Sequence, residues 1–170
     1  MQPSYKHYLK IIRNTCTGHE RPVTIPSEEL ADLARLAEDH CTVPFVLSSF
    51  RGTPFYPSML QRTRSMMLNY YQIDQFTRHT VSLLEDNGID CILLKGISLA
   101  SCYPVPEYRK LGDLDLYISQ KSDVSKAQKL LEANGYIAEN ELSDHHLTYH
   151  YTFPKTGRRF LLELHYRVVG

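Results

Sequence analysis

Two aspartates, Asp113 and Asp115, are separated by a single leucine within the β-type stretch 111–118. Successive side chains of an extended strand point to opposite faces, so both carboxylates would project from one face. Carboxylates side by side repel each other, and a divalent cation with oxygen ligands commonly relieves that repulsion. We therefore predict a Mg²⁺ site. The alternative is that Asp113 is a turn residue after Gly112 and Asp115 a solvent-facing strand residue, because a lone Asp-x-Asp pair is a weak motif.

A third carboxylate, Glu163, stands inside the largely apolar run 160–169. An unpaired charge in such a strand is costly to bury, which favours a partner for Glu163. The run follows an alternating stretch, 147–153, and a turn of hairpin length, 154–158, so Glu163 would lie on the return strand of a β-hairpin. Two aspartates and this carboxylate could form a phosphoryl-transfer site, in which metal ions neutralise a triphosphate and Glu163 helps to activate an acceptor hydroxyl.

The elements that would position these carboxylates alternate between strand and helix. An apolar run over 89–94 predicts a buried strand ahead of the aspartates. After them, the capping residue Ser122 begins a predicted helix that closes at Gly135, and a further strand starts at Tyr136. The order of strand, helix and strand predicts a β-α-β unit, which the hairpin follows.

The first half of the chain is predicted to be helical. Apolar residues recur at helical spacing over 5–14, 28–40 and 58–87, the last segment forming one long helix or two. With 170 residues the chain is long enough for one domain with a real core and a helical extension. We therefore expect a mixed α/β (α+β) fold, with a helical segment over 1–87 that packs on an α/β core over 88–170.

Composition excludes several classes of protein. Lys+Arg and Asp+Glu both number 19, so no broad attraction to a long nucleic acid or an anionic membrane is expected. No apolar run is long enough for a signal peptide or a membrane span, and we expect a cytoplasmic protein. The cysteines are widely spaced, which argues against a structural zinc site or a redox motif; they are Cys16, Cys41, Cys91 and Cys102.

Several short motifs, taken in order, resemble the uncharacterised nucleotidyltransferase family of the polymerase-β-like superfamily. They are Leu93-Leu94-Lys95-Gly96, Tyr103-Pro104, Arg109, Asp113-Leu114-Asp115-Leu116 and Glu163-Leu164-His165-Tyr166. The segment 33–40 with Val43-Pro44 is similar to the leading helical segment of that family. The resemblance implies a nucleotidyltransferase-type mixed β-sheet flanked by helices. It also implies that the metal-binding and catalytic carboxylates are those of Asp113, Asp115 and Glu163.

The phosphate-binding part of the motif departs from the superfamily. Relatives usually carry Gly-Ser at a helix start before the aspartates, where backbone amides and the hydroxyl hold the triphosphate. Here the sequence reads Lys95-Gly96-Ile97-Ser98. If these residues substitute, Lys95 supplies charge and Ser98 a hydroxyl beside Gly96, and Arg109 could reach a phosphate from the loop that follows. Lys95-Gly96 would equally suit the simple end of a strand.

Histidines supply a further set of candidates. Asp144, His145, His146 and His150 suggest a metallohydrolase, since imidazole and carboxylate suit zinc or iron. His146 and His150 are four residues apart on one strand face, so a single ion would not easily bind both, and we favour a polar strand face or an acceptor-side contact. His165 shares a face with the third carboxylate and could orient a phosphate or the acceptor; its alternative is a hydrogen-bonded strand histidine.

The leading hypothesis is an enzyme that transfers a nucleoside monophosphate from an NTP such as ATP to an acceptor hydroxyl and releases pyrophosphate, with Mg²⁺ (or Mn²⁺) as cofactor. The acceptor could be a small molecule, a sugar, a protein or RNA. The second hypothesis is a non-catalytic nucleotide-sensing or partner-binding module that keeps the fold, and the third is the histidine metallohydrolase. Relatives generally continue beyond the position of Gly170, which would make this chain part of a longer protein.

Overall fold

The computed structural model describes residues 3–18, 23–139 and 144–167. The chain divides into two compact units, one made of residues 1–70 with 100–110 and the other of residues 71–99 with 111–170. The domain boundary after residue 87 stays a prediction.

Helices build the first unit. They are α1 (Pro3–Thr17), α2 (Leu30–Asp39) after the 3-10 turn η1 (Ser27–Glu29), the short α3 (Val43–Val46) with η2 (Leu47–Phe50), and the start of α4 (Tyr56–Glu85). The helices predicted over 5–14 and 28–40 are confirmed, and α1 is longer than expected at both ends. Apolar side chains at helical spacing form the core. They are Tyr8, Ile11, Leu33, Ala34, Ala37, Val43, Val46, Phe50 and Met59.

Helix α4 (Tyr56–Glu85) is one continuous helix of 30 residues, which decides between the single helix and the pair that the sequence left open. The helix ends in a turn at Gly88, whose φ is +69°. In this turn Gly88 N donates to Glu85 O at 2.9 Å, and Ile89 N donates to Leu84 O at 3.0 Å. Within the described ranges, no helix, α4 included, is both long enough and apolar enough to cross a bilayer.

The second unit contains a five-stranded mixed sheet in the order β1-β2-β5-β4-β3. The strands are β1 (Ile92–Leu93), β2 (Leu114–Tyr117), β3 (Ile137–Ala138), β4 (His146–Thr152) and β5 (Arg159–His165). Among the strand pairs that the described residues form, β2 and β5 are parallel and the other three pairs are antiparallel. Helix α5 (Lys121–Ala133) connects β2 to β3, and the β4–β5 hairpin lies between these two strands. The predicted α+β class, the β-α-β connection and the hairpin are therefore confirmed.

Two predicted strands are shorter than the sequence suggested. The run 89–94 forms only β1, because Ile89 belongs to the turn that closes α4. The run 160–169 leaves the sheet after His165, since both Tyr166 N and Arg167 N donate to His145 O, at 3.0 and 3.3 Å. Residues 168 and 169 of that prediction lie outside the described ranges.

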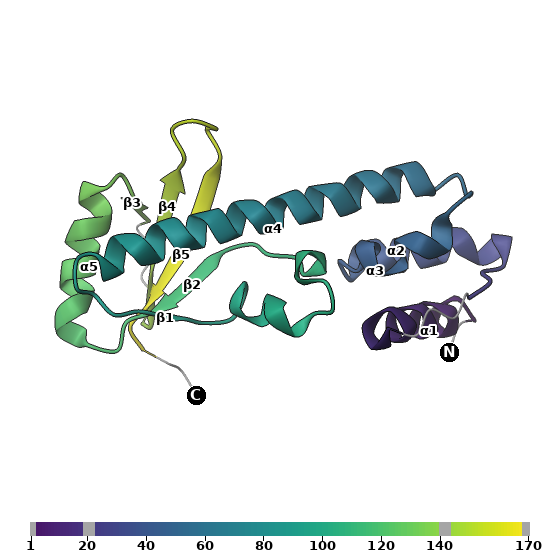
Figure 1. Ribbon diagram of the computed structural model, residues 1–170, viewed down its shortest axis with the longest axis horizontal. Helices are drawn as coiled ribbons and strands as arrows, with labels where there is room; N and C mark the ends of the chain where they lie inside the picture. Colours follow the sequence, from purple (N-terminus) through teal and green to yellow (C-terminus); the bar gives the residue numbers. More distant parts are fainter. Residues whose placement is uncertain (1–2, 19–22, 140–143, 168–170) are drawn as a thin grey trace. The chain divides into compact units, whose positions relative to one another are not determined.

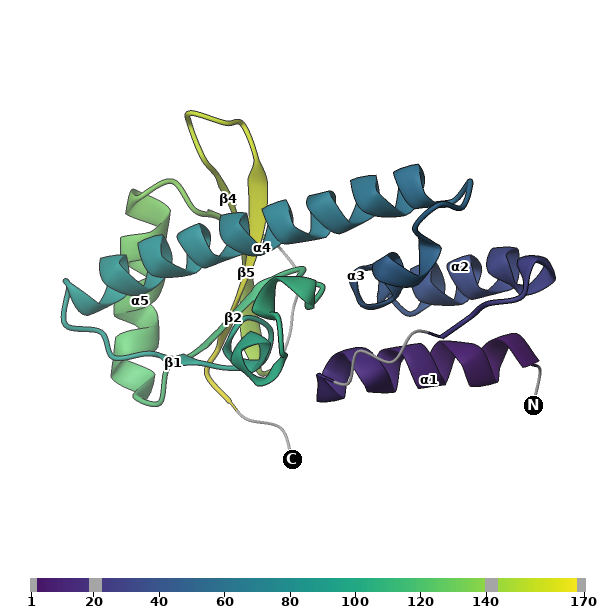
Figure 2. The same cartoon turned by 45° about the vertical axis from the view of Figure 1, so that its right-hand side comes forward.

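The two faces of the sheet differ in character. On one face, Leu114, Leu116, Leu162 and Leu164 are buried, as the strand period of two requires. Helix α4 passes across β4 and β5 on this face (Figure 1, Figure 2), and its Phe76 stacks on Phe160 with ring centroids 4.9 Å apart. The opposite face carries the polar side chains of β2, β4 and β5, and the candidate site is built there.

Candidate metal centre

Strand register places the acidic residues beside each other. In the parallel pair of β2 and β5, Asp115 is the partner of Glu163, and in the β4–β5 hairpin Glu163 is also the partner of Thr148. His165 lies one strand period further along β5, opposite His146. Directly opposed side chains on one sheet face are close enough to interact. Residues about fifty positions apart in the sequence are therefore brought to one surface by the position of β5 between β2 and β4.

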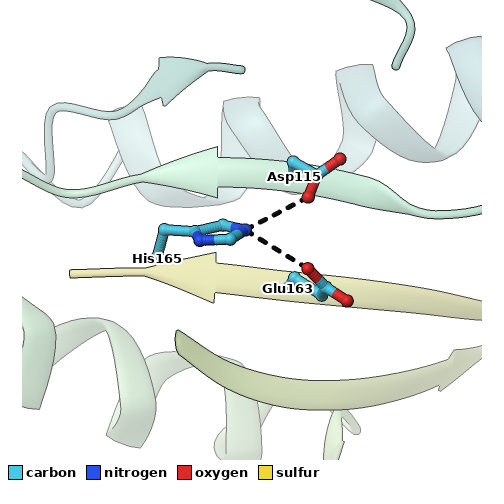
Figure 3. A group of neighbouring side chains, drawn as sticks. All are labelled: Asp115, Glu163 and His165. Carbon is cyan, nitrogen blue, oxygen red and sulfur yellow. Dashed lines mark hydrogen bonds and ion pairs between the residues drawn. The ribbon is translucent and has the colours of Figure 1, made fainter. Parts of the chain in front are cut away.

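Three side chains converge there (Figure 3). Nε2 of His165 lies 3.1 Å from Oδ1 of Asp115 and 3.3 Å from Oε2 of Glu163, and the three residues each offer one ligand atom within 4.8 Å of the others. Their side chains are 12%, 1% and 22% exposed for His165, Asp115 and Glu163 respectively. Asp115 is therefore enclosed, while Glu163 keeps some access to solvent.

Lys95 supplies a positive charge to this group. Its Nζ lies 3.1 Å from Oδ1 of Asp115, although the lysine side chain is 58% exposed. The pKa of Lys95 is raised chiefly because the ammonium donates a hydrogen bond to Asp115; burial opposes the shift, and the charges of Asp115, Glu163 and Asp113 add to it. Lys95 therefore stays cationic and partly neutralises the carboxylates.

The second oxygen of Asp115, Oδ2, is buried and has no hydrogen-bond partner within the described part of the chain. A buried carboxylate oxygen without a partner is costly, and such an exception calls for a missing group such as an ion or a water molecule. Two carboxylates and an imidazole are a suitable donor set for a divalent cation. The residues present therefore fit a divalent cation, held by Asp115, Glu163 and His165.

Asp113 is placed differently from the sequence prediction. Strand β2 begins at Leu114, so Asp113 lies just before the strand and is half-buried. It is not one of the three residues whose ligand atoms lie together. Its charge nevertheless contributes to the raised pKa of Lys95. A metal-binding role for Asp113 stays a prediction.

The predicted phosphate-binding residues belong to different parts of the fold. Gly96 lies against Asp115, whereas Ser98 begins the 3-10 helix η3 (Ser98–Cys102) and its hydroxyl donates to Leu94 O and to Lys95 O. Arg109 follows η4 (Pro106–Tyr108) in the first unit, where its Nη1 donates to Tyr103 Oη at 3.1 Å. Phosphate contacts by Ser98 and Arg109 stay predictions.

Within the described ranges, Asp144, His145, His146 and His150 do not form one group of converging ligand atoms. His150 hydrogen-bonds Glu139, whose Oε1 also lies 3.8 Å from Nη2 of Arg159. His146 instead faces His165, with ring centroids 5.2 Å apart. The converging ligand group among the described residues contains neither His146 nor His150.

Sequence reasoning missed two features of the site. Thr148 is a buried polar residue opposite Glu163, and His165 lies between the two carboxylates, whereas the sequence suggests either a contact with a phosphate or the acceptor or a hydrogen-bonded strand histidine. The spacing Glu163-x-His165 was the available signal, because alternate strand residues share a face.

Gly96→Ala is expected to weaken the site specifically. Gly96 has φ +66°, and an added Cβ would stand 3.8 Å from Oδ2 of Asp115. A non-glycine residue in this backbone region costs about 1–2 kcal/mol of stability, and the methyl group would also cover the unpartnered oxygen. We expect a lower melting temperature and weaker divalent-metal binding in calorimetry.

Gly157→Ala is the matched control for this change, because Gly157 has the same φ of +66° and nothing within 4 Å of the added Cβ. It should lower the melting temperature equally and leave metal binding intact. Equal metal affinity in the two variants would contradict a role for the Oδ2 side of Asp115 in binding.

Comparison with known proteins shows the family of this chain. A family model described as "Uncharacterised nucleotidyltransferase" matches residues 26–170, a span that includes every residue of the centre. No curated protein and no solved structure matched the chain. Since the family model covers most of its length, the chain belongs to the uncharacterised nucleotidyltransferase family.

Proposed function

We propose that this protein is a Mg²⁺- or Mn²⁺-dependent nucleotidyltransferase that transfers a nucleoside monophosphate from an NTP to an acceptor hydroxyl and releases pyrophosphate. The observation that carries the proposal is the pairing of Asp115 with Glu163 on adjacent strands of a chain that belongs to a nucleotidyltransferase family. A bound divalent ion would neutralise the negative charge of the triphosphate and of the developing pyrophosphate.

Residues of the chain would bind the ion, accept a proton and bind the phosphates. Asp115 and Glu163, together with Asp113, would hold the ion. Glu163 is the more accessible of the two paired carboxylates, at 22% against 1%, which suits it to accept the proton of the acceptor hydroxyl. The exposed Lys95 would bind phosphate oxygens as a point charge.

Three further contacts belong to the same proposal. Ser98 and Arg109 would bind the triphosphate, as the family resemblance implies. His146 would contact the acceptor, because its ring lies beside that of His165 on the polar sheet face. The acceptor class is a small molecule, sugar, protein or RNA bearing a hydroxyl group.

One observation favours a second candidate, a nucleotide-sensing module without turnover. The hydroxyl of Ser98 donates to two backbone carbonyls of its own turn, Leu94 O and Lys95 O. In that arrangement the Ser98 hydroxyl does not take the place of the phosphate-binding hydroxyl in the Gly-Ser motif of the wider superfamily. A module of this kind would bind an NTP through Lys95 and the carboxylates and transfer nothing.

Labelled nucleotides distinguish these functions. The chain is incubated with each α-labelled NTP, with Mg²⁺ or Mn²⁺, in a cell extract, and mass spectrometry identifies what acquires the nucleotide. We expect one class of molecule to gain a nucleoside monophosphate and pyrophosphate to be released in equal amount. Asp113→Asn and Asp115→Asn should both prevent transfer.

The control variant is Asp123→Asn, which changes a carboxylate on α5 that pairs with Lys126 instead of the centre. It should transfer label at the rate of the unmodified protein. NTP-induced thermal stabilisation without labelling of any molecule would support the sensing module. Unchanged NTP binding and transfer in both aspartate variants would refute the proposed function.

A further inference from the structure

We propose that Nε2 of His165 is a direct ligand of the divalent ion beside the carboxylates, so that the centre has both oxygen and nitrogen ligands and takes a first-row transition ion such as Mn²⁺ ahead of Mg²⁺. This inference rests on the proposed function, since it names the ion of that same site. The family resemblance implied carboxylate ligands only, and the imidazole comes from the geometry of β5.

Distances within the group support direct ligation. Ligands held at about 2.1 Å from an ion, in adjacent positions of an octahedron, lie about 3 Å from each other. Nε2 of His165 is 3.1 Å from Oδ1 of Asp115 and 3.3 Å from Oε2 of Glu163. An ion could therefore bind all three atoms with small movements of the side chains.

The strands hold these atoms in place. β5 is bonded to β2 on one side and to β4 on the other, and Ile118 N donates to His165 O at 2.9 Å beyond the last paired residue of β2. The His165 side chain is only 12% exposed. Ligands on central strands keep their separation better than ligands on loops. The site is therefore preorganised before an ion arrives.

The nature of the ligands decides which ion is preferred. Mg²⁺ selects oxygen ligands and gives up its water molecules reluctantly, whereas imidazole nitrogen binds first-row transition ions well. An imidazole among the ligands therefore weakens Mg²⁺ binding relative to that of Mn²⁺ and of the ions that follow Mn²⁺ in the affinity order.

Lys95 does not prevent this arrangement. Its ammonium shares Oδ1 of Asp115 with His165, so an incoming ion would compete with Lys95 for that oxygen. The lysine side chain is 58% exposed and can turn toward solvent or toward a bound triphosphate. The rival explanation is that His165 only donates hydrogen bonds to the carboxylates and positions them.

Pulsed electron paramagnetic resonance of Mn²⁺ bound to the whole chain separates the two explanations. Mn²⁺ ligated by His165 should show nitrogen modulation from a coordinated imidazole, with and without NTP. ¹⁵N-labelling of histidine should change that modulation, which tests imidazole ligation without any substitution. His165→Gln should remove the modulation, while His146→Gln, which changes the neighbouring ring, should keep it.

Competition between ions provides a second readout. We expect Mg²⁺ to displace Mn²⁺ from the unmodified chain only at large excess, and His165→Gln to lower that excess by about tenfold or more. Mn²⁺ binding without imidazole modulation, or with modulation that survives His165→Gln, would overturn the inference and leave the proposed function standing. Failure of both ions to bind, even with NTP present, would overturn both.

Discussion

Asp115→Asn is expected to lower the rate of nucleotidyl transfer by about 10³-fold or more, equivalent to about 4 kcal/mol of transition-state stabilisation. Among the described residues, Asp115 is the one whose carboxylate contacts both Lys95 and His165. Its partner on the neighbouring strand is Glu163. An amide keeps the shape of the side chain and loses the charge that binds a divalent ion. The rate is measured with the labelled NTP and the acceptor found in the transfer assay.

Thermal unfolding shows whether the loss comes from the site or from the fold. A ligand that binds only the folded chain raises its melting temperature, by an amount that grows with the logarithm of the ligand concentration above the Kd. Mn²⁺ should therefore stabilise the unmodified protein and not Asp115→Asn. Without metal the two proteins should melt within a few degrees of each other, because losing the pair with Lys95 is offset by no longer burying a carboxylate. Transfer within tenfold of the unmodified rate would contradict the role of Asp115.

Local patterns in the sequence predicted much of the fold. Helical spacing predicted α1, α2 and α4, and the alternation 147–153 followed by a short turn predicted the β4–β5 hairpin, because these elements depend on neighbouring residues. The pairing of Asp115 with Glu163 depends on β5 entering the sheet between β2 and β4. The register between strands that are distant in sequence is decided by how the buried face of the sheet packs. The pattern of residues along the chain does not reveal this packing.

Two predictions were less complete, one for a local reason and one for a long-range reason. The apolar run 89–94 looks like one strand, but Ile89 is buried against the end of α4 and completes its closing turn. For His165 the sequence leaves open a contact with phosphate or acceptor and a hydrogen-bonded strand histidine, because it does not reveal that the parallel strand β2 places Asp115 within 3.1 Å of the imidazole. Prediction from sequence therefore worked best for single elements and least well where two strands meet.

Phe76→Ala is expected to have the largest effect on stability, about 3–5 kcal/mol of the free energy of unfolding. The Phe76 ring is fully buried where α4 crosses the apolar face of the sheet. Its centroid lies 4.9 Å from that of Phe160, 5.9 Å from Tyr151 and 6.2 Å from Tyr136. Truncation leaves a cavity among aromatic rings that cannot collapse easily, and removes stacking contacts as well as buried area. Urea denaturation followed by circular dichroism measures the change.

Gln75→Ala is the matched control, since Gln75 is the exposed neighbour of Phe76 on the same helix. A surface substitution of this kind should change stability by less than about 0.5 kcal/mol. The metal centre lies on the other face of the sheet, so the folded fraction of Phe76→Ala should still bind Mn²⁺ with nearly unchanged affinity. A loss of stability below about 1 kcal/mol for Phe76→Ala would contradict the packing of α4 on this sheet. Metal binding lost from the folded variant would mean that the apolar face sets the separation of Asp115 and Glu163 through the strands.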